Sequence, residues 1–142
     1  MTAITTTLTS PQSTEVTTRP HPVRRAALVS GAVAAVATTA VAAGAHAAGV
    51  PLEIDGEMIP LAGFAQMTLL GAVVGGLIAA ALNRYSSEPR RWFVSAAVVM
   101  TVLSCVPSVA LPSDVATQVT LVATHLVAAA IIVPALVRQT RR

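Results

Sequence analysis

Residues 115–137 read "VATQVTLVATHLVAAAIIVPALV" and contain no Asp, Glu, Lys or Arg. About 20 apolar residues at ~1.5 Å rise per residue span the ~30 Å hydrocarbon core of a bilayer. Ordinary core helices are shorter, and the alternation typical of a strand is absent. We therefore expect a transmembrane helix with a histidine, His125, near its middle.

Three further runs lack charged side chains in the same way. Together the four runs predict transmembrane helices at residues 26–48, 61–82, 92–111 and 115–137. The expected fold class is all-α, a four-transmembrane-helix antiparallel bundle that forms a membrane domain of residues 23–142. Residues 1–22 are rich in Thr, Ser and Pro without apolar periodicity, which predicts a disordered cytoplasmic tail.

The composition excludes several classes of protein. Of 142 residues, 54% are hydrophobic and 11% are charged, whereas a soluble domain has about 25% charged residues to cover its surface. The single cysteine, Cys105, excludes an internal disulfide and a CxxC redox or zinc motif. The basic residues flank the apolar runs, so they indicate membrane topology and not nucleic-acid binding.

The arginines predict the orientation. All nine basic residues lie in the first 25 residues, the loop 83–91 or the C-terminal segment, and the connections 49–60 and 112–114 contain none. The positive-inside rule then places both termini and the loop 83–91 in the cytoplasm. Subtracting Glu15 and Glu88 gives 9 − 2 = +7 inside, against four acidic residues outside. The Ala, Val and Arg bias without Lys favours a bacterial origin, so we expect a multi-pass protein of the bacterial cytoplasmic membrane.

Residues 26–48 also fit a second interpretation. They follow Arg24 and Arg25 and end near small residues at Ala45 and Ala47, as a secretory signal peptide does. The apolar stretch of about 20 residues exceeds the usual 7–15 of a signal peptide. We expect a retained helix, and cleavage stays an alternative.

The connection 49–60 contains Asp55-Gly56, the residue pair of a type I′ turn, between short alternating segments. This pattern predicts a small hairpin on the outer side. Its three acidic residues, Glu53, Asp55 and Glu57, have the oxygen ligands that divalent cations prefer. The interpretation that we favour is solubility and topology, and we expect no metal site.

His125 lies ten residues after Val115, about 15 Å into the membrane. A polar side chain at that depth is costly unless it faces the bundle interior. Other polar residues fall on the same helix face or at a similar depth on neighbouring helices. The candidate buried polar cluster comprises His125, Gln118, Thr124, Ser104 and Gln66. The expected role of His125 is a hydrogen bond across helices that fixes their packing.

Several functions compete for this cluster. Haem ligation by His46 and His125 is disfavoured, because the two residues lie about 10–15 Å apart in depth along the bundle. A Ser104–His125 hydrolytic dyad lacks a GxSG context and an evident oxyanion hole. A small transporter or channel component could use the titrating imidazole, although the four runs contain no other titrating partner of the Asp, Glu, Lys or Arg type.

Gly71 and Gly75 form a GxxxG motif, which permits close approach of two helices. We favour packing within one chain, with homodimerisation as the alternative.

The stretches "GVPLEIDGEMIPLAGFAQMTLLGAVVGG" (49–76) and "ATHLVAAAIIVPALVR" (123–138) resemble an uncharacterised family of small bacterial four-helix membrane proteins. The resemblance covers about residues 23–138. Its motifs match at Gly63 to Gln66, at Thr124 and His125, and at Pro134. The resemblance implies the fold and the location but no activity.

The leading functional hypothesis is a non-enzymatic membrane protein, without cofactor, that packs with itself or with another membrane protein. A transporter or channel component is second, and a cofactor-binding membrane enzyme is third. The expected surroundings are the lipid bilayer, and nucleic acid is not an expected partner.

Overall fold

The computed structural model describes residues 22–111 and 113–141. The elements in chain order are α1 (Pro22–Ala47), β1 (Glu53–Ile54), β2 (Glu57–Met58), α2 (Leu61–Tyr85), α3 (Pro89–Ala110) and α4 (Val115–Val137). All four helices are long and apolar enough to cross a membrane. The predicted all-α fold with four transmembrane helices is confirmed, and the predicted tail lies outside the described residues except for Pro22.

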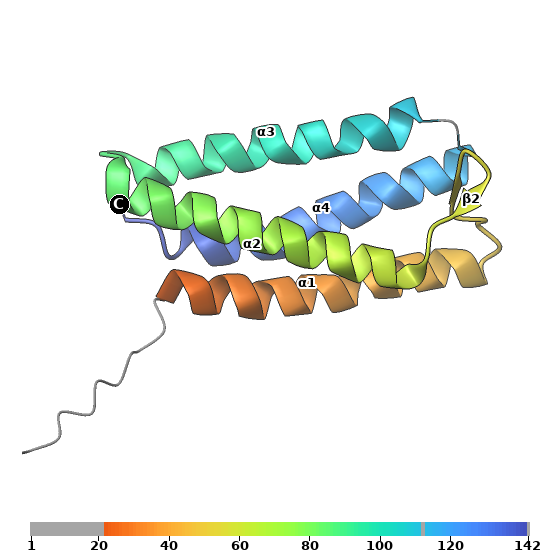
Figure 1. Cartoon of the computed structure of the whole chain (residues 1–142), viewed down its shortest axis with the longest axis horizontal. Coiled ribbons are helices and arrows are strands. Elements are labelled where there is room, and N and C mark those ends of the chain that lie inside the picture. Colours follow the sequence, from red (N-terminus) through yellow and green to blue (C-terminus); the bar gives the residue numbers. More distant parts are fainter. Residues whose placement is uncertain (1–21, 112, 142) are drawn as a thin grey trace, which may run out of the picture.

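The helices lie side by side and alternate in direction (Figure 1). The start of α1, the α2–α3 connection and the C-terminal segment share one end of the bundle, and the hairpin and the α3–α4 connection share the other. The arginine-bearing segments described by the structure thus lie at one end and the acidic connections at the opposite end. This separation is the one that the positive-inside rule requires of a multi-pass membrane protein.

The helix ends differ by a few residues from the apolar runs. α2 continues to Tyr85 and α3 begins at Pro89, because arginine is a good helix former and proline suits the first position of a helix. The start of α4 at Val115 agrees with the prediction. The carboxylate of Asp114 caps it by accepting the backbone N–H groups of Ala116 (2.7 Å) and Thr117 (3.1 Å).

The predicted hairpin is confirmed. β1 and β2 pair antiparallel, with Glu53 opposite Met58. Asp55 and Gly56 have φ values of 54° and 79°, and a type I′ turn needs a positive φ at both positions. Leu52, only 2% exposed, packs with Phe64 of α2. This contact holds the hairpin over the outer end of the bundle.

α1 and α2 approach closely through small residues. A Cβ atom added to Gly31 would lie 2.7 Å from the Cβ of Ala72, and one added to Gly76 would lie 2.8 Å from the Cβ of Ala27. Each helix therefore carries a small-xxx-small pair, and the two pairs interlock antiparallel. Close backbone approach of this kind is the main source of helix association in a membrane.

α1 supplies eight buried residues to the bundle, more than any other helix described. They include Ala34 and Ala42, which have no exposed surface. Loss of this helix would uncover the inner faces of α2 and α4. The first helix is therefore an integral part of the described bundle.

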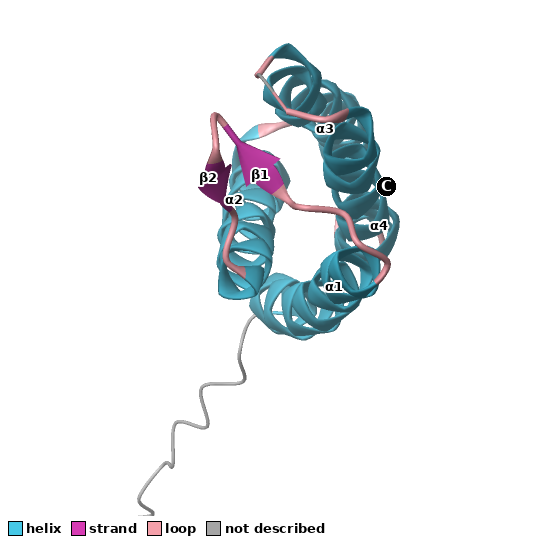
Figure 2. Cartoon of the chain, turned by 90° about the vertical axis from the view of Figure 1, so that its right-hand side faces the viewer, coloured by secondary structure: helices cyan, strands magenta, loops and turns pink. Residues whose placement is uncertain are grey.

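Viewed from the outer end, the helices follow the order α2, α1, α4, α3 around an open ring (Figure 2). α1 packs along both α2 and α4, and α3 packs mainly on α4. Only Pro89, Phe93 and Ser108 of α3 are buried. The weak contact between α2 and α3 leaves space between them, and this space contains the candidate site.

Candidate functional site

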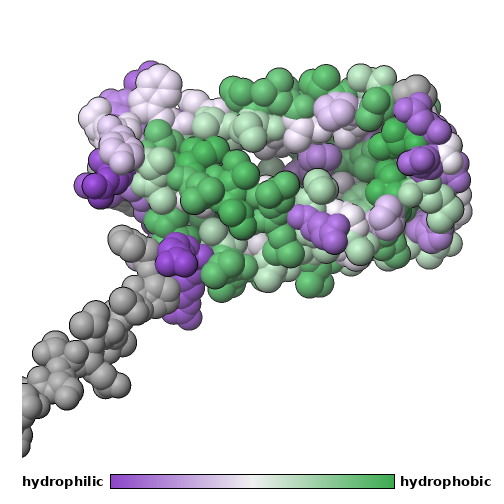
Figure 3. All heavy atoms as spheres, viewed as in Figure 1, coloured by the Kyte–Doolittle hydropathy of each residue, from purple (hydrophilic) through white to green (hydrophobic). Residues whose placement is uncertain are grey.

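A cavity of about 650 Å³ lies among α2, α3 and α4. Ile54 and Ile59 of the hairpin region line its outer end, and Phe93 and Leu136 line it near the inner end. Figure 3 shows the corresponding hollow between rows of apolar side chains on the face that includes α2 and α3. The volume lies within the ~300–1,000 Å³ range of small-molecule sites in proteins.

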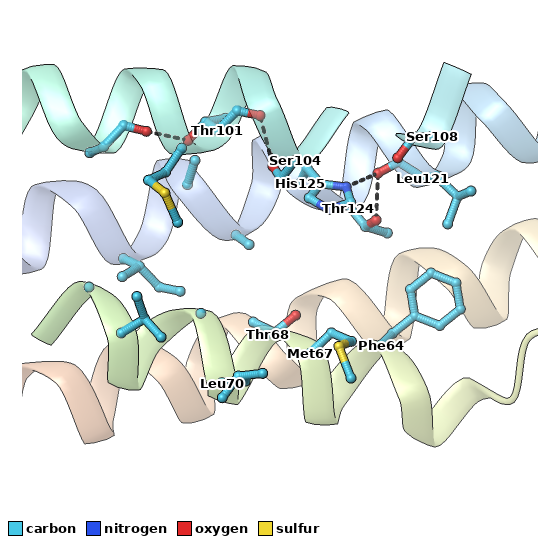
Figure 4. A pocket seen from close by; sticks show the side chains of 18 of the residues that line it. Phe64, Met67, Thr68, Leu70, Thr101, Ser104, Ser108, Leu121, Thr124 and His125 are labelled. Atoms are coloured by element: carbon cyan, nitrogen blue, oxygen red, sulfur yellow. Dashed lines mark hydrogen bonds between the residues drawn. The ribbon is translucent and has the colours of Figure 1, made fainter. Parts of the chain in front are cut away.

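The polar side chains of the lining gather on α3 and α4 (Figure 4). They are Thr101, Ser104 and Ser108 on α3, Thr124 and His125 on α4, and Thr68 on α2. Ser104 and His125 face the same part of the cavity from two helices. The structure therefore brings together three residues of the predicted cluster: His125, Thr124 and Ser104.

The ring of His125 is bound to its own helix. Its Nδ1 lies 2.7 Å from the carbonyl oxygen of Leu121. A carbonyl only accepts, so Nδ1 is the protonated nitrogen that donates, and in the neutral imidazole Nε2 is left as an acceptor. Nε2 has no hydrogen-bond partner within residues 22–111 and 113–141.

The hydroxyl groups near His125 are also bound locally. Ser104 donates to the carbonyl of Thr101 (2.7 Å), and Thr124 donates to the carbonyl of Leu121 (2.8 Å). The expectation that His125 hydrogen-bonds across helices is therefore wrong. A Ser, Thr or His in a helix can donate its polar hydrogen to a backbone carbonyl in the preceding turn of the same helix.

The two predicted glutamines do not join the cavity. Gln66 is exposed on α2 and outside the lining, which contradicts its expected burial. Gln118 is half-buried near the outer end of α4, where its amide lies 3.4 Å from the carbonyl of Ser113. Both stand on helix faces that turn away from the space between α2 and α3.

Two polar contacts between elements were not predicted from the sequence. The hydroxyls of Thr38 on α1 and Thr68 on α2 lie 3.0 Å apart. At the inner end, the amide of Asn83 donates to the carbonyl of Gln139 (2.9 Å) and accepts from the backbone N–H of Arg141 (3.0 Å). The recurrence of small residues along α1 was the available signal for the first contact, because Thr38 continues that face.

The GxxxG motif has two separate roles. Gly75 faces α4, where an added Cβ would lie 3.2 Å from a methyl carbon of Leu136. Gly71 lines the cavity, and nothing lies within 4 Å of where its Cβ would be. The close approach of α1 and α2 uses Ala72 and Gly76 of α2 and not this pair. Gly71 therefore leaves room in the cavity instead of bringing helices together.

The other candidates lie apart from the cavity or lack the needed contact. His46 is exposed in the last turn of α1. The hydroxyl hydrogen of Ser104 points to a backbone carbonyl and not to His125. No group of three His, Cys, Asp or Glu side chains able to hold a metal ion occurs in the described part of the chain.

The comparisons with known proteins give a family but no activity. No curated protein and no solved structure is significantly similar to this chain. A family model described as a family of unknown function (DUF6069) matches residues 18–142. This match confirms the resemblance to an uncharacterised family. With nearly its whole length matched, the chain belongs to this family of unknown function.

Proposed function

We propose that the chain is a non-enzymatic membrane protein that takes up one apolar small molecule from the lipid phase into the cavity among α2, α3 and α4. The observation that carries the proposal is the cavity itself, about 650 Å³ in volume and lined mainly by apolar side chains. Well-packed helical proteins contain few voids larger than a water molecule. A space of this size in the bundle therefore has room for a bound molecule.

The size of the space favours a small molecule over a partner helix. The cavity volume of about 650 Å³ lies within the ~300–1,000 Å³ range of small-molecule sites in proteins. An apolar molecule of drug-like size fits the volume without parting the bundle. This comparison modifies the hypothesis of a packing protein: the partner held between α2 and α3 is a small molecule.

Access from the bilayer supports the same proposal. Leu70 of α2 and Met100 of α3 both line the cavity, and they are 56% and 50% exposed. Since α2 and α3 make little contact, the cavity opens sideways toward the lipid tails. An apolar molecule dissolved in the bilayer can enter without crossing water.

The transporter hypothesis uses the same cavity but predicts that an ion or solute moves through it between the two sides of the membrane. Ile54 and Ile59 stand at the outer end of the space, and Phe93 and Leu136 stand near the inner end. These apolar side chains favour storage or presentation of a lipophilic molecule over movement of an ion or polar solute between the two sides.

The test compares two glycine-to-phenylalanine variants. Gly71→Phe places a ring in the cavity, whereas Gly44→Phe makes the same change on α1, away from the cavity. Nothing lies within 4 Å of the added Cβ at either position, so both variants are expected to fold. The probe is a radiolabelled para-alkylphenyl methyl ether added to the protein in lipid nanodiscs, with empty nanodiscs as the blank.

The proposal predicts saturable binding to the parent protein and to Gly44→Phe, weakened tenfold or more in Gly71→Phe. Equal saturable binding to both variants, or no binding beyond that of empty nanodiscs, overturns the proposal.

A further inference from the structure

The hydroxyl groups around His125 share a chemical property: each already donates its hydrogen in a hydrogen bond. Thr101 donates to the carbonyl of Ala97 (2.8 Å), and Ser104 and Thr124 also donate to carbonyls of their own helices. Each hydroxyl oxygen keeps lone pairs that face outward from these bonds. Around His125, these three hydroxyl groups therefore offer hydrogen-bond acceptors to a molecule in the cavity.

His125 provides the strongest of these acceptors. Its Nδ1–H donates to the carbonyl of Leu121, and in the neutral ring this tautomer leaves Nε2 as an acceptor. Thr39 Oγ1 is the one buried polar side-chain atom without a partner in the described part of the chain. His125 Nε2 also has no hydrogen-bond partner among the described residues, and the half-buried His125 lines the cavity, where a bound molecule can reach it.

From this geometry, and on the basis of the function proposed above, we infer that the bound molecule is a lipophilic phenol or alcohol whose hydroxyl donates a hydrogen bond to His125 Nε2. A hydroxyl in a hydrocarbon environment costs several kcal/mol when it lacks a partner. An acceptor inside an apolar cavity relieves that cost, so a hydrogen bond to His125 favours binding in the cavity over solution in the lipid.

The depth of His125 narrows the class of ligand. The residue lies ten positions into the 23-residue α4, about 15 Å from its outer end. A phospholipid keeps its headgroup at the interface, and only hydrocarbon, which has no donor, reaches this depth. The expected ligand is therefore a molecule that lies wholly within the bilayer and has a single small polar group on an apolar body.

Ser104 supports the same assignment from α3. Its oxygen lies on the cavity wall that faces His125, and its own hydrogen is used by the Thr101 carbonyl. The two residues flank one position for a donor. Ser108, one turn further along α3, also lines the cavity, and its hydroxyl can accept as well as donate a hydrogen bond.

The experiment compares a para-alkylphenol with its methyl ether, which has nearly the same shape but no donor. Dissociation constants for both are measured in nanodiscs with the parent protein, with His125→Leu, and with Gln118→Leu as a control on the same helix outside the cavity. The quantity compared is the phenol-to-ether affinity ratio, in which differences in partitioning into lipid cancel between proteins.

We expect this ratio to be about fivefold higher for the parent protein and Gln118→Leu than for His125→Leu, which corresponds to ~1 kcal/mol for one neutral hydrogen bond. As a readout that needs no substitution, the ¹⁵N resonance of His125 Nε2 should move when the phenol is added and stay in place with the ether.

The outcomes separate the two proposals. If the phenol and the ether bind saturably with the same ratio in all three proteins, and the Nε2 resonance does not respond, the hydroxyl assignment is wrong while the cavity function stands. If neither probe binds saturably, the proposed function fails and the assignment fails with it.

Discussion

The α1–α2 contact makes a quantitative prediction for Gly76→Ala. The new Cβ would lie 2.8 Å from the Cβ of Ala27, whereas two carbon atoms prefer a separation of ~3.5–4.0 Å. The shortfall is therefore about 0.7–1.2 Å. Neither atom can rotate away, because a Cβ is fixed to the backbone. The helices must separate, and we expect a destabilisation of ~1–3 kcal/mol, as for other overpacked interiors.

The control is Gly71→Ala on the same helix. The same methyl group there meets nothing within 4 Å, so the gain in helix propensity of up to ~1 kcal/mol is common to both variants. The difference between their unfolding free energies then measures the clash. Unfolding by SDS in mixed micelles, followed by circular dichroism, gives both values.

A compensating pair sharpens the test. Ala27→Gly removes the methyl group that Gly76→Ala would strike, so the double variant should recover more than half of the lost stability. The reasoning is refuted if Gly76→Ala is as stable as Gly71→Ala, or if the double variant shows no coupling between the two sites.

Three further predictions follow from hydrogen bonds. The Thr117 hydroxyl and backbone N–H groups lower the pKa of Asp114, so its cap stabilises α4 above the unfolded pKa of 3.8, and this stability is lost as the pH falls through the lower folded pKa. Asp114→Ala should therefore melt at a lower temperature than the parent protein at neutral pH. A difference in melting temperature that persists unchanged at strongly acidic pH would contradict this. Thr38→Val removes the hydroxyl contact between α1 and α2 and should lower the unfolding free energy by ~0.6 kcal/mol. Thr39→Val removes a buried hydroxyl without a partner, so in the same SDS assay it should leave the unfolding free energy unchanged or raise it. Asn83→Ala should speed amide hydrogen exchange at Arg141, whose N–H it binds, and unchanged exchange would show that this contact does not hold the C-terminal segment.

The helices and the hairpin could be predicted because each depends on a local signal. An uncharged apolar run of about 20 residues has few alternatives to a membrane span. The pair Asp55-Gly56 accepts the two positive φ angles of a type I′ turn. The helix ends were less predictable, because a helix can continue past the last apolar residue, as α2 does to Tyr85, and the next helix can begin before the apolar run, as α3 does at Pro89.

The contacts of the polar cluster could be predicted only in part. His125 and Ser104, which the sequence places at a similar depth, both line one cavity. Their hydrogen-bond partners could not be inferred, because a backbone carbonyl one turn back is always present and competes with a partner on another helix. Gln66 was misplaced since its depth was known but the rotation of α2 was not.

The glycine motif shows the same limit. Gly71 and Gly75 have the spacing of a contact motif, yet the close approach occurs at Gly76 and Ala72. Both pairs have a separation of four residues and differ by one position, which rotates the contact by about 100° around a helix of 3.6 residues per turn. Only the packing of α1 distinguishes the two faces.

The central claim is that an apolar molecule occupies the space among α2, α3 and α4, and its location is the most direct measurement. A diazirine derivative of the alkylphenyl methyl ether would be photolysed with the protein in nanodiscs, and the labelled peptides mapped by mass spectrometry. The account predicts saturable labelling within residues 63–78 and 96–108, which line the cavity, suppressed by excess unlabelled ether. Labelling that does not saturate and spreads equally over the outward face of α1, at residues 28–36, would contradict it.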